Sequence, residues 1–263
     1  MIQYSITKKI CFIKYFALLS ISLLCFSAKA TIVQFETNFG NFEVNLYDNA
    51  TPQTVENFLQ YVADGDYSNA VFHRSVNNFI VQGGGFSYQT AWPLGAISTN
   101  PAVANEPVYS NVRGTIAMAK LSSDPNSATN QWFFNLADNS LNLDRQNQGF
   151  TVFGEVQGDG MAIIDSIAAL PTYDLDGAFT EIPLQNFDIS NTPDDTHLVM
   201  ITNIQVIDAT VDTAAGLSPP ANIGPEPIPD FSGDDTPGGS GSLTYLVIIT
   251  LFVQLRRKLK KHF

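Results

Sequence analysis

The stretch from residue 71 to residue 85 combines polar and apolar side chains at a spacing that could form a binding site. Phe72 and Arg74 lie on one predicted strand, Ile80 and Gln82 lie on the next, and three glycines follow. Because successive strand residues point to opposite faces, we expect Phe72 and Arg74 to share a face, as Ile80 and Gln82 do. A guanidinium and a carboxamide beside aromatic and aliphatic side chains would form an apolar pocket with a polar rim, the general form of a small-ligand or peptide site.

This stretch resembles the signature of the cyclophilin family of peptidyl-prolyl isomerases, which reads roughly F-H-R-V-I-x-x-F-M-x-Q-G-G. Three later segments resemble further family motifs in the expected order. Residues 114–119 resemble G-x-[IL]-[AS]-M-A, residues 127–135 resemble S-x-x-S-Q-F-F-I, and residues 150–156 resemble V-F-G-x-V. Together the resemblance covers about residues 31–208, which we expect to form one isomerase domain.

The activity that this resemblance implies needs no covalent step, no cofactor and no metal ion. Amide resonance opposes rotation about the X–Pro bond with a barrier of roughly 18–20 kcal/mol. A guanidinium stays protonated and can donate toward the prolyl nitrogen as that atom becomes pyramidal, which stabilises charge that appears only in the twisted state. By resemblance Arg74 is this catalytic group, and Gln82 bonds the backbone of the substrate.

The resemblance also assigns side chains to substrate binding. The proline pocket and the peptide groove are implied to be formed by Phe79, Ile80, Ala119, Phe133, Leu143 and Phe150. Ile80 stands where the family usually has Met, and Phe150 stands where it often has His. Residues 141–142, in a predicted loop, take the place of a common Trp, so we expect weak cyclosporin binding.

Short strands separated by turns predict a mostly β fold. A hairpin is expected over residues 31–46, and further strands over 71–74, 79–83, 113–119, 131–136, 152–156 and 198–208. Thr51 can cap a helix that starts at Pro52 and ends at Gly65, and a second helix is expected near residues 161–170. Such a pattern favours a closed antiparallel barrel. The resemblance implies eight strands with a helix capping each end.

Both ends of the chain carry targeting patterns. Residues 1–30 read as a secretory signal peptide, because lysines precede an apolar run and Ala28-Lys29-Ala30 follows it; an uncleaved anchor is the alternative. Residues 209–237 are rich in proline and aspartate and read as a linker, semi-rigid or disordered.

The last segment, residues 238–263, combines a glycine-rich start, a short apolar run and a basic end. It resembles the GlyGly-CTERM sorting signal of some Gram-negative bacteria. This resemblance implies transient insertion in the inner membrane, cleavage by a rhomboid-type protease and passage through the type II secretion route. A plain C-terminal anchor is the alternative. We therefore expect an exported protein in the periplasm, at the cell surface or outside the cell.

The charge between residues 31 and 238 is strongly negative. All 25 acidic residues of the chain lie there, against four basic ones: Arg74, Arg113, Lys120 and Arg145. Nucleic acid and anionic membranes need a cationic surface, so they are excluded as partners of this part. Proline-containing polypeptides are the expected partners, and a monomer is expected. Both cysteines lie within residues 1–30, which leaves no thiol in the predicted mature chain.

Two rival interpretations remain beside the enzyme. The first is a non-catalytic module on a cyclophilin barrel, which would hold proline-containing peptides as a chaperone or adhesin; the presence of Arg74, Phe79, Gln82 and Phe133 favours the enzyme. The second is a metal-dependent hydrolase, which lacks support because only His73 and His197 remain in the predicted mature region and no cysteine is available as a nucleophile. The acidic loop over residues 172–196 also fails the spacing of a calcium loop.

Overall fold

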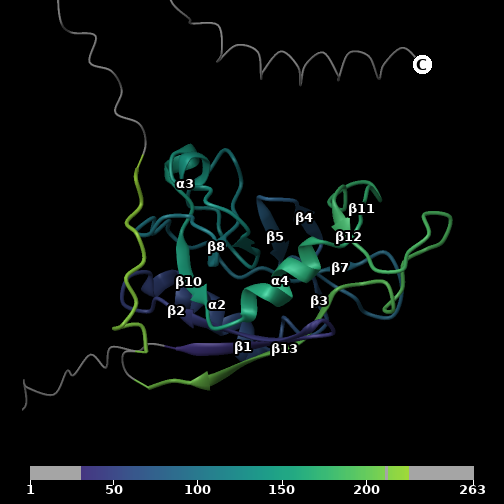
Figure 1. Ribbon diagram of the computed structural model, residues 1–263, viewed down its shortest axis with the longest axis horizontal. Helices are drawn as coiled ribbons and strands as arrows, with labels where there is room; N and C mark the ends of the chain where they lie inside the picture. The colour runs from purple at the N-terminus through teal and green to yellow at the C-terminus, as the bar shows by residue number, and fades with distance from the viewer. Residues whose placement is uncertain (1–30, 211–212, 225–263) are drawn as a thin grey trace, which may run out of the picture. The chain divides into compact units, whose positions relative to one another are not determined.

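The computed structural model describes residues 31–210 and 213–224, which form a curled antiparallel sheet with helices packed on it (Figure 1). The predicted signal peptide over residues 1–30 and the predicted sorting segment over residues 238–263 lie outside the described residues. Within the described ranges, no helix is both long enough and apolar enough to cross a membrane.

The elements follow the order expected from the sequence pattern. The strands of the main sheet are β1 (Ile32–Thr37), β2 (Gly40–Leu46), β3 (Ala70–Val71), β4 (Arg74–Val76), β5 (Ile80–Gly83), β6 (Phe86–Ser87), β7 (Gly95–Ala96), β8 (Thr115–Met118), β9 (Trp132–Asn135), β10 (Val152–Val156) and β13 (Met200–Asp208). A separate hairpin is formed by β11 (Thr172–Tyr173) and β12 (Ile182–Pro183). The helices are α2 (Pro52–Asp64), α3 (Ser140–Leu143), the 3-10 turn η1 (Gln146–Gln148) and α4 (Gly160–Ala168).

The mostly β class is confirmed, but the closed eight-stranded barrel is corrected to an open sheet of eleven strands. Its hydrogen-bonded order is β4-β5-β9-β8-β10-β2-β1-β13-β3-β6-β7. The count exceeds eight because one expected strand is divided: β3 pairs with β13, whereas β4 pairs with β5. Between them, the N–H of Phe72 donates to the carbonyl of Val199, and the N–H of His73 donates to that of Gln82. The short strands β6 and β7 extend the other end of the sheet.

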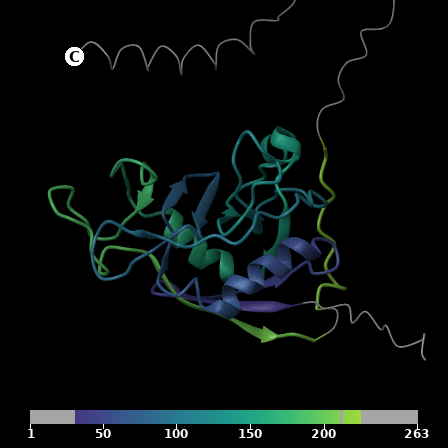
Figure 2. The same ribbon diagram turned by 180° about the vertical axis from the view of Figure 1, so that it is seen from behind.

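Both predicted long helices are confirmed. The helix α2 begins at Pro52 and ends at Gly65, whose φ of 74° is the left-handed conformation that glycine adopts readily. Thr51 does not cap it; its hydroxyl donates instead to the carbonyl of Tyr47. The helix α4 lies at the front of the domain in Figure 1. The helix α2 lies at the front in Figure 2, which shows the opposite side.

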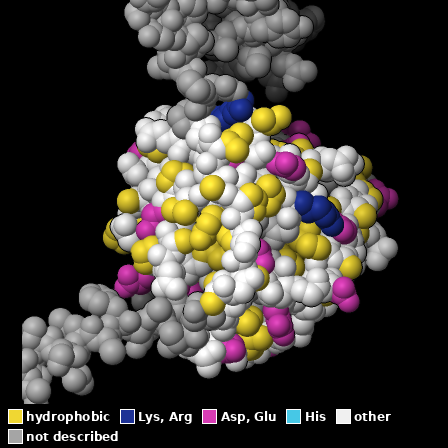
Figure 3. Space-filling view, turned by 60° about the vertical axis from the view of Figure 1, so that its left-hand side comes forward, with side chains coloured by type: hydrophobic (Ala, Val, Ile, Leu, Met, Phe, Trp, Pro, Cys, Tyr) yellow, Lys and Arg dark blue, Asp and Glu magenta, His cyan; other side chains and the backbone are white. Residues whose placement is uncertain are grey.

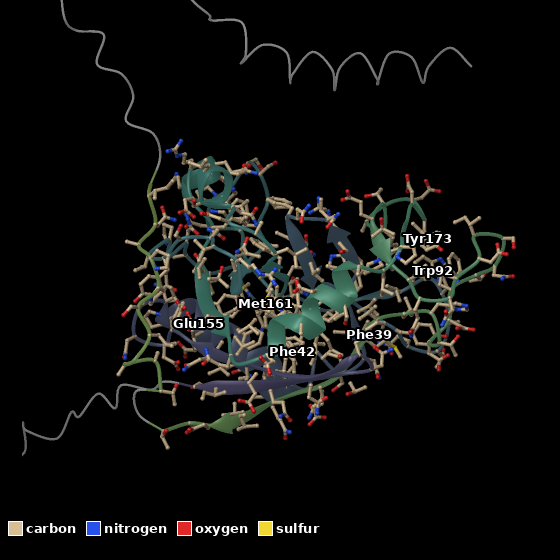
Figure 4. All side chains as sticks on the ribbon, in the orientation of Figure 1. Phe39, Phe42, Trp92, Glu155, Met161 and Tyr173 are labelled. Carbon is tan, nitrogen blue, oxygen red and sulfur yellow. The ribbon has the colours of Figure 1, made fainter. Side chains whose placement is uncertain are left out.

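Aromatic side chains fill the interior beneath these helices. Phe35 stacks on Phe42 with ring centroids 5.0 Å apart, and it meets Trp132 and Phe134 edge to face. All four are at most 3% exposed, and burial of each large apolar side chain stabilises the fold by roughly 1.5–3 kcal/mol. Figure 4 shows Phe42 beside α4, where Met161 joins the same cluster. This core fixes β8 and β9, whose outer face carries the candidate site.

The hairpin β11–β12 belongs to a smaller apolar cluster of its own. Ile182 and Leu184 are fully buried there with Val71 and Leu198. Trp92 and Tyr173 lie together at this end of the domain (Figure 4). The cluster fixes part of the acidic loop over residues 172–196 against the sheet beside β4.

Residues 213–224, which we call the C-terminal strap, pack against the domain although we expected a linker there. The N–H of Ser110 donates to the carbonyl of Pro220, and the N–H of Asn222 donates to that of Val108. The strap is drawn at the yellow end of the colour scale in Figure 1. Leu217 packs on the apolar cluster beneath the candidate site. The ordered domain therefore continues past residue 208.

Candidate active site

Four neighbouring strands place one row of side chains on the outer face of the sheet. The register pairs Arg74 of β4 with Gln82 of β5, Gln82 with Phe133 of β9, and Phe133 with Ala117 of β8. Residues directly opposite each other in antiparallel strands point to the same face. On each strand the next residue along the chain, or the one before, points to the opposite face and is buried. These residues are Ser75, Val81, Phe134 and Ile116.

A cavity of about 260 Å³ opens on this row. The eight side chains selected from the sequence all line it: Arg74, Phe79, Ile80, Gln82, Ala119, Phe133, Leu143 and Phe150. Two further residues line it that the sequence motifs did not single out, Lys120 and Gln146. Lys120 directly follows a matched motif and is one of few basic residues in the domain, which could have drawn attention to it. Gln146 carried no signal.

The floor of the cavity is apolar. Phe133, Ile80 and Leu143 are 3–4% exposed and pack in one cluster. Phe150 meets Phe133 edge to face, with ring centroids 5.9 Å apart. A small apolar ring such as that of proline can exchange water for these side chains, which is favourable in proportion to the apolar area that it buries.

Phe72 does not share a face with Arg74, contrary to the expectation from strand alternation. It is fully buried in the main core, where its ring meets Trp132. The alternation fails because Phe72 and His73 lie between β3 and β4 and belong to neither strand. Ile80 and Gln82 do share a face, since β5 is continuous and both line the cavity.

The close approach of β5 to β9 depends on the glycines that end the motif. Gly84 has a φ of +81°, and a Cβ there would lie 2.4 Å from the carbonyl oxygen of Asn130. A Cβ on Gly83 would lie 2.8 Å from the ring of Trp132. Glycine therefore lets the chain turn against β9 and keeps Gln82 in register with Phe133.

The guanidinium of Arg74 forms an ion pair that the sequence did not predict. Its Nε donates to Oε2 of Glu181 over 2.9 Å. Glu181 directly precedes β12 and lies in the acidic loop over residues 172–196. A guanidinium has five N–H donors, so this bond leaves four for other partners.

The carboxamide of Gln82 is held by a second amide. Its Nε2 donates to Oε1 of Gln131 over 2.8 Å, from the residue just before β9. This bond fixes one end of the carboxamide at the rim and leaves its own oxygen as an acceptor for a peptide N–H.

Lys120 closes the side of the cavity next to Phe150. Its Nζ donates to the carbonyl oxygens of Asn147 and Gly149 and lies 4.8 Å from the centre of the Phe150 ring. Burial lowers the pKa of Lys120 to about 8. The ammonium thus anchors the segment that carries Phe150 while it is protonated.

A network of amides and one buried carboxylate supports Leu143 from behind. Asn139 donates to the carbonyl of Phe79 and to Oδ1 of Asn135, which ties α3 to β5 and β9. The carboxylate of Asp144 is fully buried and accepts from Ser110, from Asn111 and from the strap. These bonds hold the loop of residues 139–150 over the apolar floor.

His73, beside Arg74 in the sequence, faces away from the cavity lining. It is 3% exposed and meets Phe86 edge to face. Its Nδ1 has no hydrogen-bond partner among the residues that the structure describes. Burial lowers the pKa of the imidazole to about 4, so the side chain is neutral near pH 7.

The surface of the domain reflects the acidic composition. Figure 3 shows Asp and Glu side chains spread over the face that it presents, with few Lys or Arg side chains among them. Two of the four basic side chains between residues 31 and 238, Arg74 and Lys120, line the cavity. Arg74 is paired with Glu181, so Lys120 is the cation of the cavity lining for which the described residues show no ion pair.

Comparison with known proteins gives a consistent result. The family model described as cyclophilin type peptidyl-prolyl cis-trans isomerase/CLD matches residues 32–193. A peptidyl-prolyl cis-trans isomerase of Acinetobacter baylyi is 43% identical over 143 residues, which cover 54% of this chain and 74% of that protein. Peptidyl-prolyl cis-trans isomerase B of Escherichia coli is 40% identical over 147 residues, which cover 54% of this chain and 86% of that protein.

Solved structures were compared as well. The crystal structure of a cyclophilin type peptidyl-prolyl cis-trans isomerase from Cryptosporidium parvum aligns with a TM-score of 0.49 at 21% sequence identity. The alignment covers 68% of this chain and 98% of that one.

Proposed function

Because this chain belongs to the cyclophilin-type peptidyl-prolyl cis-trans isomerase family, we propose that it accelerates X–Pro isomerisation in exported polypeptides, with Arg74 as the group that weakens amide resonance. The observation that carries this proposal is the cross-strand row, in which a guanidinium and a carboxamide flank an apolar floor.

The mechanism is non-covalent. Phe133, Ile80 and Leu143 would hold the proline ring by apolar contact, and Gln82 would accept from the backbone of the peptide. With the ring fixed, the preceding carbonyl turns about the X–Pro bond. A free N–H of Arg74 donates toward the prolyl nitrogen as its lone pair localises, so the bond is strongest in the twisted state and lowers the barrier.

Replacement of Arg74 tests this mechanism. Arg74→Ala should lower kcat/KM for a proline-containing peptide ten-fold or more, since each loss of about 1.4 kcal/mol of transition-state stabilisation gives a factor of ten. A protease-coupled or NMR exchange assay measures the rate, and circular dichroism checks the fold.

Arg113→Ala is the matched control for charge. Arg113 pairs with Asp165 at the surface and does not line the cavity, so its loss should leave kcat/KM unchanged. A folded Arg74→Ala protein with wild-type kcat/KM would refute the role of Arg74. Peptide binding without any catalysed isomerisation by the wild-type protein would favour the non-catalytic module instead.

Export is a proposal that rests on residues 1–30 and 238–263. Intact-mass measurement on protein from the native host should show a chain that begins at Thr31 and ends close to Gly239. A mass that includes the basic end of the chain would favour a permanent anchor over the sorting signal.

A further inference from the structure

The ion pair between Arg74 and Glu181 connects the candidate site to a separate part of the fold. The two side chains come from positions far apart in the sequence and meet through Nε and Oε2 at 2.9 Å. They are 34% and 39% exposed, so solvent screens the pair only in part. Charge-assisted hydrogen bonds of this length are stronger than those between neutral groups.

The backbone of Glu181 is fixed beside the same strand. The N–H of Ser75 donates to the carbonyl of Glu181 over 2.8 Å. This bond is made on the free side of β4, which is an edge strand of the sheet. Glu181 thus contacts two consecutive residues of β4, one through its backbone and one through its carboxylate.

Apolar packing on both sides prevents Glu181 from moving away. Ile182 is fully buried in the cluster around β11 and β12. Phe179 meets Phe86 and Trp92 at centroid distances of 4.9 and 5.1 Å. The backbone of Glu181 is therefore held at β4 from both sides, which keeps its carboxylate within reach of Nε of Arg74.

We propose that Glu181 is a positioning residue for Arg74: it holds the guanidinium by Nε so that the terminal N–H groups stay at the proline pocket. The inference rests on the role proposed above for Arg74. Preorganised donors stabilise a transition state without reorganisation at the moment of reaction. Loss of Glu181 should therefore reduce kcat and leave KM for the peptide nearly unchanged, because the apolar floor stays intact.

The test compares Glu181→Ala and Glu181→Gln with Asp195→Asn in the full-length protein. Asp195 is an exposed residue of the same acidic loop, and its substitution changes the charge as Glu181→Gln does. We expect Glu181→Ala to lower kcat roughly two- to five-fold, as for loss of a partly exposed ion pair. Glu181→Gln should retain part of the rate, since an amide oxygen still accepts from Nε, and Asp195→Asn should match the wild type.

A double-mutant cycle separates positioning from support of the hairpin. In the Arg74→Ala background, Glu181→Ala should cause no further loss, because there is no guanidinium left to orient. The Nε–H resonance of Arg74 in ¹H–¹⁵N spectra should be protected from exchange in the wild type and exposed in Glu181→Ala. An equal loss of kcat in both backgrounds would overturn the positioning role.

The cycle also separates this inference from the proposed function. If Arg74→Ala lowers kcat/KM while Glu181→Ala keeps the wild-type kcat, only the positioning role is refuted. If Arg74→Ala keeps the wild-type kcat/KM, the proposed mechanism itself fails. A higher kcat in Glu181→Ala would mean that the ion pair restrains the guanidinium away from the substrate, which also refutes positioning.

Discussion

Phe133→Ala should lower the free energy of unfolding by about 3–5 kcal/mol, the usual cost of truncating a buried phenylalanine. Phe133 is 3% exposed and packs with Ile80, Leu143 and Phe150. The same truncation removes the largest side chain of the apolar floor on which a proline ring would rest. We therefore also expect KM for a proline-containing peptide to rise roughly ten-fold, as for the loss of a few buried methylene contacts. Urea titration and steady-state kinetics measure the two effects.

Phe134 provides a matched control for this prediction. It is the next residue on β9, is fully buried, and points into the main core beside Phe35 and Trp132. Phe134→Ala should cost similar stability without changing KM for the folded fraction. If the alanine variants fail to fold, Phe133→Leu and Phe134→Leu allow the same comparison of stability and KM. Equal KM values in the two folded variants would show that the proline ring binds elsewhere.

Acidification should destabilise the domain through His73. The imidazole has a pKa of about 4 in the folded protein and about 6.5 in an unfolded chain. Below about 6.5 the unfolded chain binds a proton that the folded protein does not, so stability falls as the pH falls through this window. From the two pKa values, the loss between about pH 7 and about pH 4 is about 3 kcal/mol.

Urea titrations of the wild type and of His73→Phe across this pH range measure the effect. The carboxylates titrate in both proteins, so their contribution cancels in the difference, and the curve of His73→Phe should be flatter by about 3 kcal/mol. His73→Leu should give the same flattening, which separates titration from packing. Stability curves that run parallel in wild type and variants would contradict the prediction.

The motifs that resemble the family single out eight side chains, and the structure places all eight around one cavity. Four of the eight lie on strands, and the other four lie at strand ends or in the loop of residues 139–150. Alternation predicts which residues of one strand share a face, but it does not predict the register that brings Gln82 beside Phe133. The long helices could also be predicted from the sequence; in α2, proline marks the start and glycine marks the end. The predicted orientation of Phe72 was wrong for a local reason. Phe72 and His73 lie between β3 and β4, whereas the alternation of side chains requires an unbroken strand.

The remaining features depend on contacts between distant parts of the chain. Glu181 reaches Arg74 only because a separate hydrophobic cluster places the hairpin β11–β12 beside β4, and no local pattern predicts that docking. The docking of the strap could not be predicted from the sequence either, because its proline-rich composition is typical of linkers. Its backbone nevertheless forms hydrogen bonds with Val108 and Ser110. The number of strands depends on the point at which the chain leaves its pairing with β13 and begins to pair with β5. The spacing of apolar residues does not predict that point.

The part of the cross-strand row that lines the cavity, from Arg74 through Gln82 to Phe133, also sets a length for the ligand. Neighbouring strands lie about 4.8 Å apart, so two intervals measure roughly 10 Å. An extended chain advances about 3.3–3.6 Å per residue, so this length matches roughly three residues. A proline in a helix or in a packed core cannot present such a stretch. On the function proposed above, we expect the prolines that reach this site to lie in unfolded polypeptides or in loops that stay extended after folding.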